Sequence, residues 1–520
     1  MDSPLRSGIE QVVGGGSKKI VIIGSGMGGL SCAIMLLKAG HQVTVLEKNR
    51  QFGGNLQIFV RDKRIFDTGV HYIGGLGKGQ NLYKFFKYFE IMDDLKLLKC
   101  DEDCYDKITF SGDEKEYSHA QGYENFITQL VKDFPNEEVG LRKYIDKLQE
   151  ICNQFPIYHL KKESTNVIIS DSLEINTRDF IKSCTNDVKL QNVLGGTNAL
   201  YGGVGDETPL YVHALIINSY VEGAYKCVDG GSQIERLMVK KIKELGGEVL
   251  KYKDVKRIVC NDLGVAEFIE TAEGEKFEAD IFISNADIKQ TIGMVENSKI
   301  RKAYINRINS LKSTISVFIV NVVLKENAVP YQNYNHYHYL TDDVWKGVEY
   351  KENEWPTQYA VFCPPNSKSE KYADCLTFLA YMNYEDVKQW EETFHTIPHQ
   401  INERSSEYQQ FKDKCTQKLL AAAEEQYPDL KENIVSVHAS TPLTYRDYIG
   451  TEDGSLYGIA KDHKDPIKTF ITPKTKVPNL FLTGQNLNMH GILGVTISAL
   501  VTCGQIISTN DLIDNIEAAQ

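Results

Sequence analysis

The stretch from Ile20 to Asn49, "IVIIGSGMGGLSCAIMLLKAGHQVTVLEKN", decides the fold of this chain. Its first residues, with Lys19, form the short β-branched run "KIVII", which is typical of a buried parallel strand. Apolar residues then recur at helical spacing as far as Leu37, and Gly40 fits the position just after a helix C-terminus. The run "QVTVL" predicts a second strand. The stretch therefore predicts a strand, a turn, a helix and a second parallel strand.

The turn carries the pattern G-x-G-x-x-G. Gly24 permits the tight turn, Gly26 lets backbone amides approach a pyrophosphate, and Gly29 lets the helix pack closely on the strand. The helix N-terminus offers free N–H groups and partial positive charge to phosphates. Glu47, at the end of the second strand, is placed to bind ribose hydroxyls. A signal peptide is the alternative, but the glycines interrupt the apolar run and no cleavage site follows.

The cofactor predicted for this site is FAD. Glu47 is followed by "KNRQFGGN", whose pair Gly53–Gly54 resembles the extended signature of flavoproteins with two dinucleotide-binding domains. No second G-x-G-x-x-G is present, and "GGLGKGQN" (74–81) lacks the GK[ST] ending of a phosphate loop, so a plain turn is expected there. One nucleotide site is therefore visible, and NAD(P)H as the electron source is left open.

The totals narrow the class of protein. A chain of 520 residues implies more than one domain or one large composite domain. A net charge of −12 argues against nucleic acid as a partner, because phosphate contacts need a basic face. The 11 scattered cysteines indicate reduced thiols in a cytoplasmic protein rather than disulfides or a zinc site. The sequence contains no uninterrupted apolar run of about 18 residues, so no membrane-spanning helix is predicted.

The C-terminal stretch "VPNLFLTGQNLNMHGILGVTISALVTCGQII" (477–507) predicts a strand ending at Gly484 and a helix starting at Gly494. Such a helix can aim its N-terminus at the N1–C2=O edge of an isoalloxazine, where its dipole stabilises the reduced anion. The alternative is a buried C-terminal helix without cofactor contact. The glycine motif at the other end of the chain favours the first interpretation.

Two further segments allow alternative interpretations. Residues 82–99 place Leu82, Phe85, Phe86 and Phe89 at helical spacing among lysines. A surface helix packed on the core is favoured over a helix that touches a membrane beside a lipid entrance. In "PYQNYNHYHYL" (330–340), His336 and His338 share one strand face, but an aromatic strand edge is favoured over a metal site, and no metal is expected.

Several stretches resemble the carotenoid desaturase and isomerase superfamily of flavoproteins. They cover most of the cofactor-binding parts and some of the substrate region: "GSGMGGLSCA", "FDTGVHYIGG" (66–75), "ETPLYVHALIINSYVEGAYKCVDGGSQIERL" (207–237), "ISNAD", "STPLTYRDYIGTEDGSLYGI" (440–459) and "LFLTGQN". The chain departs from the family at Asn486, where an Asp is usual. An Asn keeps similar hydrogen bonds but changes the charge. The chain also departs at Cys227, where the family tends to have an apolar-Pro pair before the glycines.

The resemblance implies an α/β fold of the two-dinucleotide-binding-domain (Rossmann-like) FAD type with a mixed α+β substrate domain. The FAD domain is expected from residues 18–95, 228–300 and 441–510. The substrate domain is expected to have a helical part, 96–227, and a sheet part, 301–440. Residues 1–17 are expected to be a flexible leader and 511–520 a tail.

The activity implied is FAD-dependent electron transfer to or from C=C bonds of a long apolar, retinoid- or carotenoid-like polyene. Saturation is favoured, and desaturation or cis/trans isomerisation on the same scaffold is the alternative. A flavin-containing carrier without turnover is an alternative of another class. The protein is expected to be cytoplasmic, with contact to a membrane surface left open.

His71 and Tyr72, which follow the "DTG" turn, and His490 are the candidates for a proton donor, and the two histidines are the ones assigned as general acid. A structural or cofactor-positioning role is favoured over catalysis for each of them, and His213 is expected to pack within the substrate region. The cofactor contacts expected are Gly24, Ser25, Gly26, Met27, Gly28, Gly29, Glu47, Lys48, Gly53, Gly54, Asn55, Asp67, Thr68, Gly69, His71, Tyr72, Val255, Asn285, Gly484, Gln485, Asn486, Gly494, Val495 and Thr496.

Overall fold

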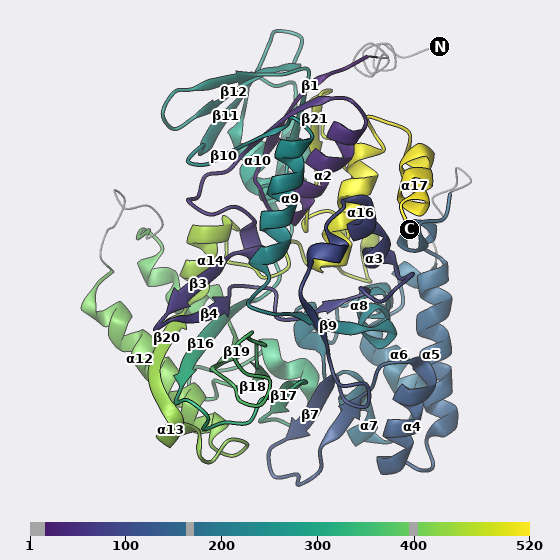
Figure 1. Ribbon diagram of the computed structural model, residues 1–520, viewed down its shortest axis with the longest axis vertical. Helices are drawn as coiled ribbons and strands as arrows, with labels where there is room; N and C mark the ends of the chain where they lie inside the picture. Colours follow the sequence, from purple (N-terminus) through teal and green to yellow (C-terminus); the bar gives the residue numbers. More distant parts are fainter. Residues whose placement is uncertain (1–15, 163–170, 395–403) are drawn as a thin grey trace.

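The computed structural model describes residues 16–162, 171–394 and 404–520 (Figure 1). Nearly all of the expected leader, residues 1–17, lies outside these ranges. Among the helices in the described ranges, none combines the length and apolar character needed to cross a membrane. The 11 cysteines all lie in these ranges, and all are free thiols.

A five-stranded parallel sheet organises the upper part of the molecule in Figure 1. Its strands come from segments far apart in the sequence, in the order β10 (Glu248–Leu250), β2 (Gln42–Leu46), β1 (Lys19–Ile23), β14 (Ile281–Ser284) and β21 (Leu480–Leu482). Both faces are covered, because Ile20 and Ile22 of β1 belong to one apolar core while Val21 and Ile23 belong to another. This explains why "KIVII" is apolar throughout instead of alternating.

Three helices pack on the first face of this sheet: α2 (Met27–Lys38), α9 (Ser232–Glu244) and α16 (Gly491–Cys503). A four-stranded sheet covers the second face, in the order β13 (Lys276–Glu278), β12 (Ala266–Thr271), β11 (Val255–Cys260) and β15 (Val295–Glu296). Gly40 has a φ of 89° directly after the end of α2, as the sequence predicts. The helix α16 begins at Gly491, three residues earlier than expected, with His490 as its N-cap.

The lower part of the molecule is built on a seven-stranded sheet. The order is β20 (Ile434–Ser440), β16 (Ser316–Leu324), β19 (Cys375–Met382), β18 (Gln358–Phe362), β17 (Asn335–Tyr339), β7 (Asp106–Phe110) and β8 (Tyr117–His119). Only β17 and β7 pair in parallel. The expected division into a helical segment, 96–227, and a sheet segment, 301–440, is therefore wrong at β7 and β8. These short strands complete the sheet because they add to its edge beside β17.

Helices surround this sheet, and short strands join the two parts. A three-stranded sheet has the order β5 (Ile73–Gly74), β9 (Ala224–Cys227) and β6 (Leu97–Lys99), and β3 (Ile58–Arg61) forms a hairpin with β4 (Arg64–Asp67). The helices of the substrate part are α4 (Tyr123–Asp133), α5 (Glu138–Asn153), α6 (Thr177–Cys184), α7 (Val188–Leu194), α8 (Leu210–Glu222), α12 (Ser406–Ala423), α13 (Leu430–Asn433) and α14 (Pro442–Ile449). The remaining helices are α3 (Asn81–Tyr88), α10 (Ile288–Met294), α11 (Lys302–Asn309), α15 (Pro466–Thr469) and α17 (Thr509–Ala518).

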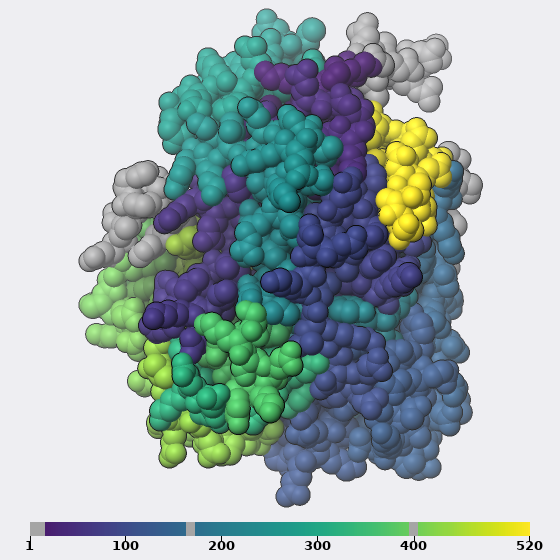
Figure 2. Space-filling view, viewed as in Figure 1, coloured from purple at the N-terminus to yellow at the C-terminus, as the bar shows by residue number. Residues whose placement is uncertain are grey.

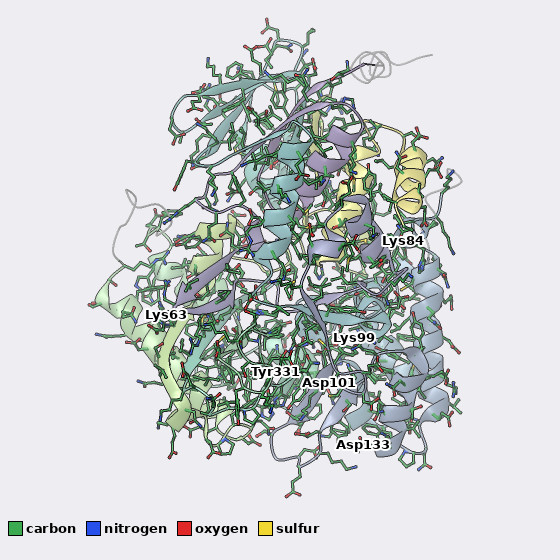
Figure 3. The ribbon with its side chains drawn as sticks, viewed as in Figure 1. Lys63, Lys84, Lys99, Asp101, Asp133 and Tyr331 are labelled. Carbon is green, nitrogen blue, oxygen red and sulfur yellow. The ribbon has the colours of Figure 1, made fainter. Side chains whose placement is uncertain are left out.

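The helix α3 packs on the core and does not offer its aromatic face to solvent. It ends at Tyr88, and Phe85, Phe86 and Phe89 are fully buried. Lys84, labelled in Figure 3, extends to Glu517 of α17 at 2.7 Å. The expected tail, 511–520, thus lies mostly in a helix that covers α3, and Figure 2 shows this yellow segment against the dark blue one. The interpretation as a helix packed on the core is confirmed for residues 82–88, whereas residues 97–99 of the expected stretch form the strand β6.

Candidate dinucleotide-binding site

The two ends of the chain and its middle meet at the glycine-rich turn between β1 and α2. Gly24 has a φ of 92°, which only glycine adopts readily. A Cβ on Gly29 would lie 2.1 Å from the carbonyl oxygen of Gly24, so the first turn of α2 packs directly on the loop. The amide of Asn285, just after β14, fills the space above the loop. A Cβ on Gly28 would lie 2.6 Å, and one on Gly484 2.5 Å, from its Oδ1.

Glu47 ties the glycine-rich loop to the end of β2. Its Oε2 accepts hydrogen bonds from the backbone N–H of Ser25 at 3.1 Å and from the Ser25 hydroxyl at 2.6 Å. Its Oε1 accepts from the N–H of Asn49 at 2.8 Å. Ser25 Oγ also accepts from the N–H of Gly53 at 3.1 Å, which joins the second glycine pair to the first motif. Glu47 is 5 % exposed and lines the cavity described next.

A cavity of about 220 Å³ lies over the carboxyl ends of the parallel strands. This is where ligands bind in open α/β sheets. Sixteen of the residues expected to contact the cofactor line it: Gly24, Gly26, Met27, Gly28, Glu47, Lys48, Gly53, Gly54, Asn55, Gly69, Val255, Asn285, Gly484, Gln485, Asn486 and Val495. The structure thus brings together positions more than 400 residues apart in the sequence.

The other expected contacts lie beside this cavity or behind its wall. Ser25 and Gly29 support the loop from below, and Thr496 donates to the carbonyl of Ile492 within α16. Asp67 and Thr68 line a neighbouring wider cavity, while Tyr72 and Gly494 line a third cavity rich in aromatic side chains. His71 lines none of the three cavities.

Two buried acceptors on the cavity wall lack partners among the described residues. They are Oδ1 of Asn55 and Oδ1 of Asn486. The Nδ2 of Asn486 donates to Asp287 at 3.3 Å, so its orientation leaves the oxygen free. Because a buried acceptor without a partner costs free energy, hydroxyl donors of a bound ribose or ribityl chain fit these positions. The residues present therefore suit a dinucleotide, and Asn486 retains the acceptor that the family's usual Asp would provide.

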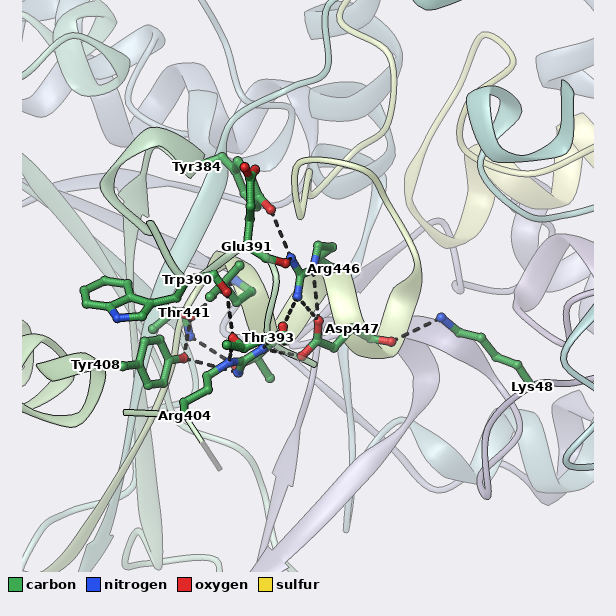
Figure 4. A network of polar contacts seen from close by, with 12 residues as sticks. Lys48, Tyr384, Trp390, Glu391, Thr393, Arg404, Tyr408, Thr441, Arg446 and Asp447 are labelled. Atoms are coloured by element: carbon green, nitrogen blue, oxygen red, sulfur yellow. Dashed lines mark hydrogen bonds and ion pairs between the residues drawn. The ribbon is translucent and has the colours of Figure 1, made fainter. Parts of the chain in front are cut away.

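Lys48 connects this site to α14. Its ammonium donates to the carbonyl of Asp447 at 3.1 Å, and burial lowers the pKa of Lys48. The carboxylate of Asp447 contacts both Arg404 and Arg446, with Arg446 Nη2 at 2.7 Å (Figure 4). Arg446 also donates to the carbonyls of Glu391 and Thr393. This buried network fixes α14, and with it the wall that α14 contributes to the dinucleotide cavity.

Two further cavities share residues with the dinucleotide cavity. The wider one, about 910 Å³, lies between the β3–β4 hairpin, α12, α14 and β20, and its wall mixes apolar with charged side chains. It shares Asn49, Tyr445, Tyr448 and Ile449 with the dinucleotide cavity.

The third cavity is narrow, about 70 Å³, and we call it the aromatic cavity. It shares Gly491 and Ile492 with the dinucleotide cavity, at the N-terminus of α16. Its wall contains Tyr72, Tyr158, Leu200, Tyr211, Val212, Leu215, Ile216, Tyr220, Met489, His490 and Leu493.

The two histidines proposed as general acids are deeply buried. Burial lowers the pKa of His71 to about 4, and the positive charge of Lys226 acts in the same direction. His71 stacks on Phe362, with ring centroids 4.2 Å apart. Burial also lowers the pKa of His490 to about 4, and its Nε2 lies 3.2 Å from the carbonyl oxygen of Leu200. Both imidazoles are therefore neutral near pH 7, and the acid role of each stays a prediction. His213 packs in the substrate part between Tyr144 and Tyr201, as expected.

Sequence reasoning missed most of the wall on the side of α14. Asp287 of "ISNAD" lines the dinucleotide cavity, as do eight residues of the motif "STPLTYRDYIGTEDGSLYGI" and the helix start that follows it: Tyr445, Tyr448, Ile449, Gly450, Thr451, Leu456, Tyr457 and Gly491. The signal was present, since both stretches carry the family resemblance and the one at 440–459 is specific to it. Except for Asn285, their residues were not assigned to the site because neither motif contains a recognisable phosphate loop.

Comparisons with known proteins agree with this geometry. Residues 22–89 match the family model described as an NAD(P)-binding Rossmann-like domain. The chain is 28% identical to all-trans-retinol 13,14-reductase of Danio rerio, with 95% of this chain and 86% of that protein covered. An inactive all-trans-retinol 13,14-reductase of Danio rerio is 23% identical over 91% and 83%. Prolycopene isomerase 2 of an Oncidium hybrid cultivar is 23% identical over 94% and 83%.

Solved structures share the fold. A mutant of putrescine oxidase superposes with a TM-score of 0.61 at 14% identity, with 95% of this chain and 99% of that chain covered. An oxidoreductase of Methanosarcina mazei gives a TM-score of 0.58 at 16% identity over 93% and 99%. The fold and the site thus define a dinucleotide-binding protein of the oxidoreductase type. Over nearly its whole length the chain is similar to all-trans-retinol 13,14-reductases, and it is more distantly similar to prolycopene isomerases.

Proposed function

We propose that this chain is an FAD-dependent oxidoreductase that saturates a C=C bond of a long, apolar, retinoid-like polyene. One observation carries the proposal. The aromatic cavity meets the dinucleotide cavity at Gly491 and Ile492, where α16 directs its N-terminus. An apolar chain in the first cavity would lie against the reactive end of a cofactor in the second.

The residues that would hold FAD surround the dinucleotide cavity. The glycine-rich loop and the N-terminus of α2 suit the pyrophosphate, and Glu47 suits a ribose. Asn55 and Asn486 offer free acceptors to hydroxyls. The N-terminus of α16 suits the edge of an isoalloxazine that becomes negative on reduction. When bound, FAD supplies the two electrons of the reaction.

The aromatic cavity suits a polyene because its wall is mainly apolar and aromatic. An unactivated polyene has no carbonyl to hold developing charge, so the reaction depends on position against the flavin and on delocalisation along the chain. The relatives named all-trans-retinol 13,14-reductase favour saturation, and the relative named prolycopene isomerase keeps isomerisation as the second candidate. Because a polyene partitions into bilayers, we include uptake from a membrane surface in the proposal.

Mass analysis separates these functions. The purified protein is loaded with FAD, reduced anaerobically and mixed with all-trans-retinol, while the flavin absorbance is followed. Saturation reoxidises the flavin and adds two hydrogens to retinol, desaturation by the oxidised enzyme removes two, and isomerisation leaves the mass unchanged. A protein that takes up FAD but leaves all-trans-retinol and a set of carotenoids unchanged, with no effect of either on its flavin, would refute catalysis and favour the carrier.

Sedimentation with lipid vesicles checks the membrane part of the proposal. The protein should pellet with vesicles loaded with retinol more than it pellets alone. Equal recovery in the supernatant with and without vesicles would remove the membrane surface from the proposal.

A further inference from the structure

A buried carboxyl group stands behind the wall of the aromatic cavity. Asp106, the first residue of β7, is fully buried, and its Oδ2 lies 2.8 Å from the hydroxyl of Tyr72. Its Oδ1 accepts from the Nδ2 of Asn335 at 2.8 Å. The hydroxyl of Tyr72 also lies 2.8 Å from that of Tyr337. Because Tyr72 itself lines the aromatic cavity, one hydrogen bond connects the buried carboxyl group to the cavity wall.

The surroundings of Asp106 allow it to hold a proton near neutral pH. Burial raises the pKa of Asp106 to about 7, while hydrogen bonds from Asn335 and Tyr72 and the charge of Lys226 act in the opposite direction. Lys226 is itself buried and donates to three backbone carbonyls, those of Gln332, Tyr334 and Cys363. Three donated bonds require the ammonium form of Lys226. Its positive charge therefore stabilises the carboxylate form of Asp106.

Among the described residues, none of the other titratable groups around Asp106 competes for this proton in the neutral range. Burial is the main cause that raises the pKa of each neighbouring phenol and thiol: Tyr72, Tyr105, Tyr220, Tyr337, Cys100 and Cys104. Burial lowers the pKa of His119, which pairs with Asp106 across β7 and β8, to about 4.

The direction of the hydrogen bonds depends on the state of Asp106. As a carboxylate, Asp106 accepts from the Tyr72 hydroxyl. As a carboxylic acid, it donates to the Tyr72 oxygen, and the proton of Tyr72 is then free to turn toward Tyr337 or the cavity. When Asp106 is protonated, the hydrogen bond between the two side chains uses the proton of Asp106. The proton of the Tyr72 hydroxyl is then available for transfer.

We propose that Tyr72 is the general acid of the reduction and that Asp106 is the positioning residue that reloads it. This assignment rests on the saturation proposed above. When bound, reduced FAD would supply the two electrons as a hydride to one carbon of the C=C bond. The O–H bond of Tyr72 breaks as its proton forms a C–H bond on the neighbouring carbon. The proton of Asp106 passes to the Tyr72 oxygen, and the carboxylate takes up a proton from solvent before the next turnover.

Two substitutions and a matched control test the relay. Tyr72→Phe removes the hydroxyl, and Asp106→Asn keeps the shape of the side chain but cannot pass on a proton. Tyr359→Phe is the control, because the Tyr359 hydroxyl is also buried and has no hydrogen-bond partner among the described residues. FAD content and retinol binding are measured for each protein. The rate of flavin reoxidation by all-trans-retinol is then followed anaerobically from pH 5 to 9.

General acids contribute about 10²–10⁴-fold to such steps, so Tyr72→Phe should slow reoxidation by that factor at unchanged FAD content. Asp106→Asn should also slow the step and should remove the fall in rate expected above pH 7. Tyr359→Phe should leave both rate and pH profile unchanged. A Tyr72→Phe protein that reoxidises its flavin at the wild-type rate would overturn the relay and leave the saturation standing, whereas a wild-type protein without reaction would overturn both.

A second measurement does not depend on turnover. Infrared spectra of the wild-type protein should contain the C=O absorption of buried carboxylic acids that disappears as the pH rises through about 7. The contribution of Asp106 should be missing from this absorption in Asp106→Asn, whereas that of Asp67, whose pKa burial also raises to about 7, should remain. If the spectra of the two proteins do not differ in this region, Asp106 holds no proton near neutral pH and the relay is wrong, whatever the kinetics show.

Discussion

Substitution of Gly29 by alanine adds one methyl group and tests the contact between α2 and the glycine-rich loop. Gly29 lies in the first turn of α2, and a Cβ there would stand 2.1 Å from the carbonyl oxygen of Gly24. Non-bonded atoms settle at about 3.5–4.0 Å, and the obstacle is backbone, which cannot rotate away as a side chain can. The Gly29→Ala substitution therefore has to push α2 and the glycine-rich loop apart.

The magnitude follows from two opposing effects. Alanine in a helix interior is favoured over glycine by about 0.5–1 kcal/mol. Overpacking of a close contact costs about 1–3 kcal/mol. We expect Gly29→Ala to lower the free energy of unfolding by about 1–2 kcal/mol, and displacement of Gly24 to weaken FAD binding by about tenfold or more.

Gly293→Ala is the matched control for this substitution. Gly293 lies in α10, and a Cβ there meets nothing within 4 Å. Its stability should stay unchanged or rise by up to about 1 kcal/mol, with normal FAD binding. The assays are urea unfolding of the apoprotein and titration with FAD followed by flavin fluorescence. A Gly29→Ala protein that equals the wild type in both assays would show that the loop and α2 do not pack as described.

Three other substitutions test separate features. Glu47→Gln places an amide against three N–H and O–H donors, so we expect a loss of about 1–3 kcal/mol in urea unfolding and at least tenfold weaker FAD binding. Phe86→Ala, in the buried face of α3, should lower the free energy of unfolding by about 3–5 kcal/mol without changing FAD content. A loss near zero would show that the Phe86 side chain is not packed in the core. Asp106 has a raised pKa in the folded state, so its contribution to stability is full below about pH 4 and is lost as the pH rises through about 7. Asp106→Asn should make unfolding free energies fall less between pH 5 and 7, and a slope equal to wild type would contradict this. Part of the slope should remain, because burial also raises the pKa of Asp67 to about 7.

Short sequence patterns correctly predicted the helices and strands that depend on neighbouring residues alone. The runs "KIVII" and "QVTVL" form β1 and β2, and the apolar spacing between them forms α2. Gly40 adopts a positive φ after this helix because no other residue does so at low cost. The apolar spacing of residues 82–89 gives α3, and its burial follows from the same spacing. In each case the signal lies within about a dozen consecutive residues.

Contacts between distant segments were not predictable in this way. The amide of Asn285 closes the glycine-rich loop only because β14 lies beside β1 in the sheet. The strands β7 and β8 lie within a mainly helical segment of the sequence. β7 joins the seven-stranded sheet by pairing with β17, which lies more than 200 residues further along the chain. The start of α16 at Gly491 follows from a φ of 71° at that glycine, which the sequence allows but does not require.

The proton donor shows why residue type alone misleads in a buried site. Histidine is the usual choice because its ordinary pKa is close to neutral. Burial opposes the charged form of any group, so it lowers the pKa of His71 and His490 to about 4 and raises that of Asp106 to about 7. The ranking of the three groups as proton donors at pH 7 is therefore inverted. Behind the wall of the aromatic cavity, a buried carboxyl group that is hydrogen-bonded to a phenol of that wall is therefore a better store of a proton at pH 7 than a buried imidazole.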